Sequence, residues 1–262
     1  MTGRIVDANV NLSRWPTRRL PLDETGKLAA KLRSLGVEEA WAGTFDGLLH
    51  KDLASANDRL ARECREISAI RLVPFGTVNP LLPDWEEDLR RCAEDHRMPG
   101  IRVYPAYHGY GLDHPAFARL LGLAATRRLV VAIPLIMEDQ RTMHPRLIVP
   151  PVDTTPLAGL LEKTPGARVL LLNALTLLKG EKLAALFRAG DVSVDIAMLE
   201  GVAGVANLLK AVPEDRVLFG THAPFFYPES AAMKLRESPL ADPQARAIRE
   251  GNARRLLTWP EP

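Results

Sequence analysis

Ile5-Val6-Asp7-Ala8-Asn9-Val10-Asn11-Leu12 is the stretch that sets the pattern of the chain, and it reads as a buried first strand. Side chains alternate between the two faces of a strand, so Asp7, Asn9 and Asn11 are expected on one face and the apolar residues on the other. Three polar side chains in a row on a strand otherwise suited to the interior indicate a site. We therefore expect this strand to contribute to the chemistry as well as to the core.

Short β-branched runs alternate with amphipathic stretches along the whole chain, and eight such pairs can be counted. The expected strands lie at residues 5–12, 37–45, 70–78, 101–104, 129–133, 168–172, 192–196 and 216–220. The helices that follow them are expected to begin near residues 25, 49, 83, 114, 156, 180, 200 and 242. Apolar strands separated by helices imply a parallel sheet with helices outside it, and eight such units close a barrel. We predict an α/β fold in which residues 1–262 form a single (β/α)8 TIM barrel.

The composition limits the classes of partner. With 47% hydrophobic and 25% charged residues, the chain resembles an average globular protein. Its 34 basic and 32 acidic residues are interspersed, so no basic stripe suits nucleic acid. The longest apolar run, residues 129–137, is too short to span a membrane, and no signal peptide is expected before the first strand. Cys64 and Cys92 lie in helical patterns, which argues against disulfides and agrees with a cytoplasmic protein. A homo-oligomer is compatible with the sequence.

Three segments together resemble one known family: residues 5–12, Gly100-Ile101-Arg102-Val103-Tyr104-Pro105, and residues 217–225 with Gly220-Thr221-His222. They resemble the amidohydrolase superfamily, most closely its amidohydrolase-related barrel hydrolases and decarboxylases. The resemblance implies a metal held by Asp-x-His-x-His at the first strand and by Gly-(Ser/Thr)-Asp at the eighth. In this chain Asn9 and Asn11 stand where the histidines would be, and His222 stands where the catalytic aspartate would be. Strand six ends in Asn173, again without an imidazole.

The replaced residues predict a site without the usual metal. Zinc prefers imidazole, thiolate or carboxylate ligands, whereas an asparagine amide is a neutral oxygen donor. A hydrolytic zinc site typically needs three strong protein ligands, and the set at this place offers only His222. We therefore expect no cofactor, with a divalent metal such as zinc as the alternative that the family implies. A relocated metal site that uses Glu138, His144 and His222 is a further alternative.

The roles expected at the strand ends divide into proton transfer and substrate binding. The imidazole of His222 is expected to act as general acid or base, oriented by Asp7 or Asp195, with Glu138 as a second proton carrier. The expected substrate-binding residues are Asn9, Asn11, Tyr104, His108, Arg141, His144 and Asn173. Each set also has a structural interpretation: a hydrogen-bonded plug of amides, loop packing of the aromatic residues, or a Glu138–Arg141 pair that fixes its own loop.

These expectations lead to a metal-independent hydrolase of a lactone, ester or amide, or to a decarboxylase, that acts on a small substrate bearing a carboxylate or carbonyl group. The alternative is a catalytically inactive barrel that serves as a ligand-binding or scaffold protein. Arg14, Arg18 and Arg19 are expected to lie in a solvated loop. Residues 138–154, with their prolines, form a candidate lid.

Overall fold

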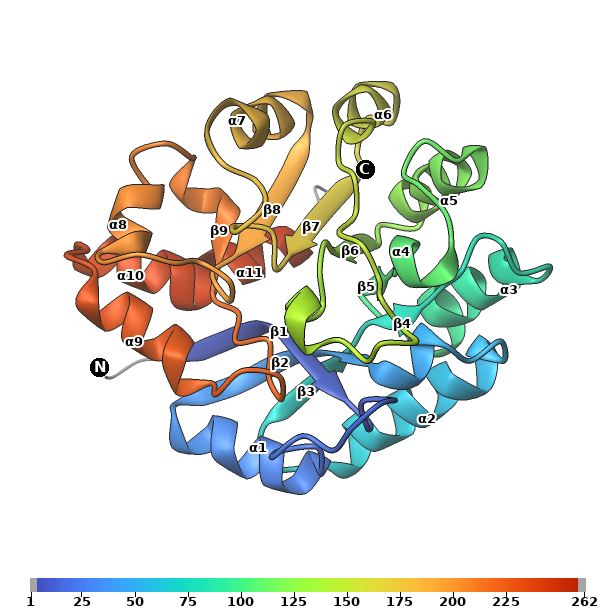
Figure 1. The fold of residues 1–262 in the computed structure, drawn as a ribbon, viewed down its shortest axis with the longest axis horizontal. Coiled ribbons are helices and arrows are strands. Elements are labelled where there is room, and N and C mark those ends of the chain that lie inside the picture. Colours follow the sequence, from blue (N-terminus) through green and yellow to red (C-terminus); the bar gives the residue numbers. More distant parts are fainter. Residues whose placement is uncertain (1–3, 259–262) are drawn as a thin grey trace.

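Parallel strands and surrounding helices alternate along the chain in the computed structural model, which describes residues 4–258 (Figure 1). The strands are β1 Ile5–Leu12, β2 Val37–Thr44, β3 Arg71–Pro74, β4 Gly76–Thr77, β5 Gly100–Arg102, β6 Val130–Pro134, β7 Arg168–Leu172, β8 Asp191–Asp195 and β9 Val217–Leu218. They pair in parallel in the orders β1-β2-β3 and β4-β5-β6-β7-β8-β9. Because β3 and β4 flank Phe75, they occupy one strand position of the eight that the sequence predicts.

Backbone hydrogen bonds join the two sheets into a ring. The amide of Phe75 donates to the carbonyl of Ala42 at 2.8 Å, which continues the β2 pairing past the break between β3 and β4. At the other seam the amide of Ala8 donates to the carbonyl of Phe219 at 2.9 Å. Val10 also forms a parallel bridge with Ala223. These contacts place β1 beside β9, and the predicted TIM barrel is confirmed.

Helices cover the outside of the ring (Figure 1). They are α1 Thr25–Ser34, α2 Leu53–Glu66, α3 Trp85–Arg90, α4 Pro105–His108, α5 Pro115–Thr126, α6 Leu157–Lys163, α7 Gly180–Ala189, α8 Gly204–Leu208, α9 Glu229–Glu237, α10 Asp242–Arg246 and α11 Asn252–Leu257. Several boundaries follow local chemistry: the carboxylate of Asp52 caps α2 through the amide of Ser55, and Pro115 opens α5. The helix α9 was not predicted, and α4 lies in a segment that was expected to be an aromatic loop.

A register shift in β1 changes the expected alternation of its side chains. The pairing of β1 with β2 is irregular between Asp7 and Val10. Val6 and Ala8 pack in a cluster that includes Ala253 of α11, whereas Val10 and Leu12 belong to the larger cluster that includes the helix residues of α1. The apolar residues of β1 therefore do not all share one face, as strict alternation predicts, and polar Asn9 follows directly after an inward-packed Ala8.

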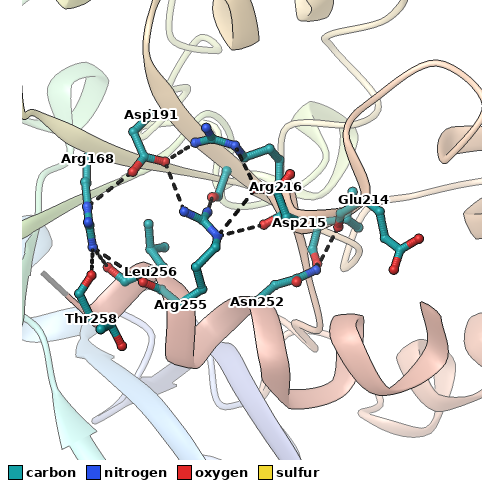
Figure 2. A network of polar contacts seen from close by, with 11 residues as sticks. Arg168, Asp191, Glu214, Asp215, Arg216, Asn252, Arg255, Leu256 and Thr258 are labelled. Carbon is teal, nitrogen blue, oxygen red and sulfur yellow. Dashed lines mark hydrogen bonds and ion pairs between the residues drawn. The ribbon is translucent and has the colours of Figure 1, made fainter. Parts of the chain in front are cut away.

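An ionic network connects the amino ends of the strands to α11 (Figure 2). Asp191 accepts from Nε of Arg168 at 3.2 Å and also pairs with Arg216, and Nη1 of Arg255 lies 3.6 Å away. Arg168 donates in addition to the carbonyls of Leu256 and Thr258 near the helix end, at 2.8 and 2.6 Å. Four elements far apart in sequence are thereby held together at this end of the barrel.

No helix within residues 4–258 has both the length and the apolar character needed to cross a bilayer.

Candidate active site

Six of the residues predicted from the sequence meet at the carboxyl ends of β1, β7, β8 and β9, where barrel enzymes place their chemistry. They are Asp7, Asn9, Asn11, Asn173, Asp195 and His222. None of them has more than 1% of its surface exposed. These residues were expected at the strand ends of a barrel, whereas their complete burial was not expected.

The amide of Asn9 links two of the strands. Its Nδ2 donates to Oδ1 of Asn173 at 2.8 Å and to Oδ2 of Asp195 at 2.6 Å. The backbone amide of Asn173 completes the triangle by donating to Oδ1 of Asp195 at 2.9 Å. Gly220 makes room for the carboxylate of Asp195, since a Cβ at position 220 would lie 2.7 Å from Oδ2 of Asp195.

Both buried carboxyl groups have a raised pKa. Asp7 accepts hydrogen bonds from the amides of Asn9 and Thr221 and, at 2.6 Å, from the Thr221 hydroxyl. Burial raises the pKa of Asp7 to about 7, although these bonds oppose the shift. Burial likewise raises the pKa of Asp195 to about 6, against the bond from Asn9. Two groups at the strand ends can therefore exchange a proton near neutral pH.

His222 is oriented differently from our expectation. Its Nε2 donates to the carbonyl of Met137 at 2.7 Å, and not to Asp7 or Asp195. The ring stacks on Phe225 with centroids 5.0 Å apart. Burial lowers the pKa of His222 to about 4, so the imidazole is neutral at pH 7. The prediction that a carboxylate orients this ring is wrong because the loop after β6 supplies the acceptor.

Two residues of the network adopt a backbone conformation that is uncommon for side chains with a Cβ. Asn173 has φ of 57° and His222 has φ of 56°. Both lie just after a strand, where the chain turns out of the barrel. Backbone of this kind is concentrated at functional sites, because the surrounding structure must hold it in place.

Arg102 is a member of the site that the sequence reasoning did not select. It ends β5, and only 1% of its surface is exposed. Its Nη1 donates to Oδ1 of Asn11 at 2.7 Å and to the carbonyl of Val10 at 3.1 Å. In the sequence Arg102 alternates with apolar neighbours, which is equally typical of a solvent-facing strand residue, so no local signal distinguishes the two.

The other charged candidates lie apart from this network. Glu138 pairs with Arg18 at 2.6 Å, so the expected Glu138–Arg141 pair is not formed. Arg14, Arg18 and Arg19 are exposed, as expected, and Arg18 reaches Glu138 from the surface. Arg141 is exposed and pairs with Asp139. His144 is exposed as well, and its Nδ1 accepts from the amide of Arg146. Sequence proximity misled here, because Glu138 turns inward while the residues that follow it turn outward.

Aromatic side chains cover the network. Tyr104 and Met137 belong to a buried cluster that also holds Trp15 and Phe45. Trp15 packs edge-on against Phe225, with centroids 4.6 Å apart. His108 donates from Nε2 to the carbonyl of Gly47 at 2.9 Å, and burial lowers the pKa of His108. The loops after β1, β2, β5 and β9 thus close the mouth of the barrel, with aromatic rings where the sequence predicted a substrate-binding loop. 

A cleft of about 900 Å³ lies beside this aromatic cover. Its lining comes from the segments that follow β6, β7, β8 and β9 and from α9. Three lining residues also touch the network or its neighbours: the carbonyl of Ile136 accepts from Asn173, the Phe225 ring stacks on His222, and Lys234 donates to the carbonyl of Ile196 next to Asp195. One layer of residues therefore separates the cleft from the buried groups.

Comparisons with known proteins agree with the fold and the family. A model of the Amidohydrolase family matches residues 16–259, and a search of curated proteins finds no significant match. The chain is similar to 2,6-dihydroxybenzoate decarboxylase from Rhizobium, with 17% identity, a TM-score of 0.74 and coverage of 98% of this chain and 99% of that one. It is similar to 5-carboxyvanillate decarboxylase from Sphingomonas paucimobilis, with 17% identity, a TM-score of 0.76 and coverage of 98% and 99%. A dihydroxybenzoic acid decarboxylase from Polaromonas, solved with bound manganese and 2-nitroresorcinol, has 15% identity, a TM-score of 0.74 and coverage of 98% and 97%.

The expectation that no cofactor is involved is contradicted by the manganese in the Polaromonas enzyme, which has the same fold. Within residues 4–258 no group of three His, Cys, Asp or Glu side chains is placed to hold a metal ion, and this includes the alternative set of Glu138, His144 and His222. Asn9 directs its Nδ2 donor toward Asp195. This arrangement does not fit a divalent ion, because an N–H donor and not an oxygen lone pair points into the site.

Proposed function

This chain belongs to the amidohydrolase family, and on that premise we propose that it is an enzyme that hydrolyses or decarboxylates a small substrate bearing a carboxylate or carbonyl group. The observation that carries the proposal is the pair of buried carboxyl groups, Asp7 and Asp195, at the carboxyl ends of β1 and β8. Perturbed carboxyl groups gather at active sites because proton transfer is most efficient when the pKa lies near the working pH.

Each reaction uses these carboxyl groups in a definite way. In a hydrolysis, an ionised carboxylate accepts the proton of the attacking water, and the acid so formed then protonates the leaving group. In a decarboxylation, the carboxylic acid form donates its proton to the carbon that loses carbon dioxide. A pKa of about 7 for Asp7 leaves both forms populated near neutral pH. His222 stays neutral and positions Asn173 and the loop after β6, in place of the acid–base role expected for it.

The surroundings favour a ring-shaped substrate. The wall of the cleft includes Phe225, Phe226 and Tyr227, whose rings offer flat apolar contacts. The structures to which this chain is similar include decarboxylases of 2,6-dihydroxybenzoate and 5-carboxyvanillate, which are aromatic carboxylates. We therefore place aromatic carboxylates first among the substrates and lactones second.

The test is an assay of turnover on a panel of hydroxybenzoates and lactones, with and without added manganese, in which chromatography detects the products. Asp7→Asn keeps an oxygen for the two amides that Asp7 accepts from, and it lacks the titrating proton. The variant should fold and lose at least about 100-fold in kcat, which is the usual contribution of a general acid or base. Asp52→Asn, which keeps an accepting oxygen at the exposed cap of α2, is the control and should retain full activity. Undiminished turnover by Asp7→Asn would contradict the proposal.

A second candidate function is ligand binding without turnover. The buried cluster that holds Trp15, Phe45, Tyr104 and Met137 favours ligand binding without turnover, because this cluster separates the polar network from solvent. Saturable binding of a panel compound, together with an absence of product under every condition, would select this function over catalysis.

A further inference from the structure

Arg102 lies inside the barrel without a carboxylate partner among residues 4–258. Its Nη1 bonds to Asn11 and Val10, and its Nη2 lies 3.4 Å from the carbonyl of Trp41. All three acceptors are neutral. Burial raises the pKa of Asp195, and the charge of Arg102 opposes that rise, but the two side chains do not form an ion pair. An unpaired cation is costly in the interior, so its retention calls for a function.

The chain makes room for this guanidinium. Gly43 of β2 lies directly against it, and a Cβ at that position would be 2.7 Å from Nη1 and 2.8 Å from Cζ. Any side chain at this position would displace Arg102, since real Cβ contacts are not this short. β5 therefore supplies a buried cation, Arg102, and β2 supplies the space for it at Gly43.

Three buried donors around Arg102 have no acceptor among the residues that the structure describes. They are Nε of Arg102, Nδ2 of Asn11 and the hydroxyl of Tyr104. Asn11 contacts Arg102 directly. Burial raises the pKa of Tyr104, and the nearby guanidinium of Arg102 opposes that rise. Buried polar groups are satisfied in most proteins, and each exception calls for an explanation. Here the unsatisfied atoms are all donors, and they gather around one positive charge.

We propose that Arg102, Asn11 and Tyr104 form a binding site for a carboxylate group of the ligand. This proposal rests on the proposed function, whose substrate class it narrows to organic carboxylates. A carboxylate has two oxygens with four lone-pair directions and one negative charge, so it accepts from all three donors and neutralises the guanidinium. A benzoate-type ring attached to it would extend past Tyr104 toward Tyr107.

A small cavity lies on the Tyr104 side of this site. It lies against Tyr104 and Tyr107 and beneath Ile136, Met137 and the loop that follows them, up to Val152. Its volume of about 10 Å³ accommodates no more than a water molecule. Entry of a ring therefore requires the loop after β6 to swing outward, and this loop coincides with the candidate lid at residues 138–154.

Tyr104→Phe is the most informative variant because it removes only the unpartnered hydroxyl. It should change the melting temperature little, since the hydroxyl donates no internal hydrogen bond and only its interaction with Arg102 is lost. Binding of 2,6-dihydroxybenzoate, measured by calorimetry, should weaken about 10-fold, the usual loss for a hydrogen bond to a charged group. Tyr110→Phe is the matched control: its hydroxyl is also buried without a partner, but it is not placed against Arg102. This control should bind as the wild type does.

Resorcinol tests the carboxylate itself, because it is the same ring without that group. It should bind at least 100-fold more weakly than 2,6-dihydroxybenzoate to the wild type. Arg102→Met removes the cation and should reduce the difference in affinity between the two probes. Gly43→Ala displaces Arg102, so it should have the same effect, and it replaces Arg102→Met if that variant fails to fold. Equal affinity for both probes, no binding of benzoate or 2,6-dihydroxybenzoate, or equal affinities in Tyr104→Phe and Tyr110→Phe would overturn the proposal.

The outcomes separate this proposal from the proposed function. Carboxylate binding that depends on Tyr104, without any turnover, supports the site and rejects the enzyme. Turnover that is unaffected by Tyr104→Phe in both KM and kcat supports the enzyme and rejects the site. Lys234 supplies another cation at the cleft, so loss of carboxylate binding in Lys234→Met but not in Tyr104→Phe would place the carboxylate there and overturn the proposal.

Discussion

Both ends of the barrel carry charged side chains, which face different surroundings. At the amino ends Asp191 lies among three arginines, and the side chains of this group remain 12–32% exposed (Figure 2). At the carboxyl ends Asp7, Asp195 and Arg102 are at most 1% exposed, and none is in an ion pair within the described residues. The first group pairs opposite charges directly and is partly hydrated. The second is neither hydrated nor paired.

The difference separates stabilisation from function. Partly exposed charges with opposite partners lose little hydration and gain a direct attraction, so they stabilise the closure of the barrel by α11. Buried charges without partners reduce stability, and a fold that keeps them must gain something else from them. In barrel enzymes that division also follows the strand direction, with stability at the amino ends and chemistry at the carboxyl ends.

Asp191→Ala should show the largest effect. It removes the acid from the amino-end network and leaves Arg168, Arg216 and Arg255 facing one another (Figure 2). We expect the free energy of unfolding in urea to fall by about 3 kcal/mol, because three arginines at 12–32% exposure lose their shared acceptor, and loss of one partner of a buried pair costs about 3–5 kcal/mol. Glu181→Ala removes an exposed acid that pairs with Arg188 and is the control. Equal losses in both variants would show that the network contributes no more than an ordinary surface pair.

The outer features of the molecule follow from local sequence, whereas the site depends on distant contacts. The apolar run at residues 129–133 predicts β6 to within one residue, and the amphipathic segment Gly180–Ala189 predicts α7. Arg102 and Arg18 could not be selected in this way. The space for Arg102 is provided by Gly43, 59 residues earlier, and the partner of Arg18 is Glu138, 120 residues later. Periodicity locates a strand end, but it does not show which charges the fold will bury.

The pH dependence of stability tests the carboxyl end. The pKa of Asp7 rises from 3.8 to about 7 on folding, so folded protein binds this proton more tightly than unfolded chain. The resulting stability is complete below about pH 4 and is lost as the pH rises toward 7. Asp7→Asn has no such proton, so between these limits the wild type should lose about 2 kcal/mol or more relative to the variant. The opposing titration of His222 is present in both proteins and cancels.

Urea unfolding of both proteins at a series of pH values measures this difference. Asp153→Asn is the control with the opposite sign, because hydrogen bonds from Thr155 lower the pKa of Asp153. The stability that Asp153 gives the wild type over Asp153→Asn is present above the unfolded-state pKa of about 4, and it is lost as the pH falls below that value. A wild-type curve parallel to that of Asp7→Asn would mean that Asp7 titrates normally, and the contrast between the two ends of the barrel would then rest on Arg102 alone.

The smallest effects on stability should come from the loop after β6. Here partly exposed ion pairs, like those at the amino ends of the strands, lie beside the buried network. Arg18 is the partner of Glu138, whose side chain is only 5% exposed, whereas Arg141 is 88% exposed and pairs with Asp139. Arg18→Ala should therefore cost about 1 kcal/mol, allowing for solvent screening of a half-exposed arginine, and Arg141→Ala should leave thermal unfolding unchanged. If this loop opens to admit ligand, Arg18→Ala should also accelerate binding of 2,6-dihydroxybenzoate in stopped-flow measurements, because the ion pair holds the loop closed. An unchanged association rate would mean that ligands reach the site by another route, and the Arg18–Glu138 pair would then serve stability only, as the pairs at the amino end do.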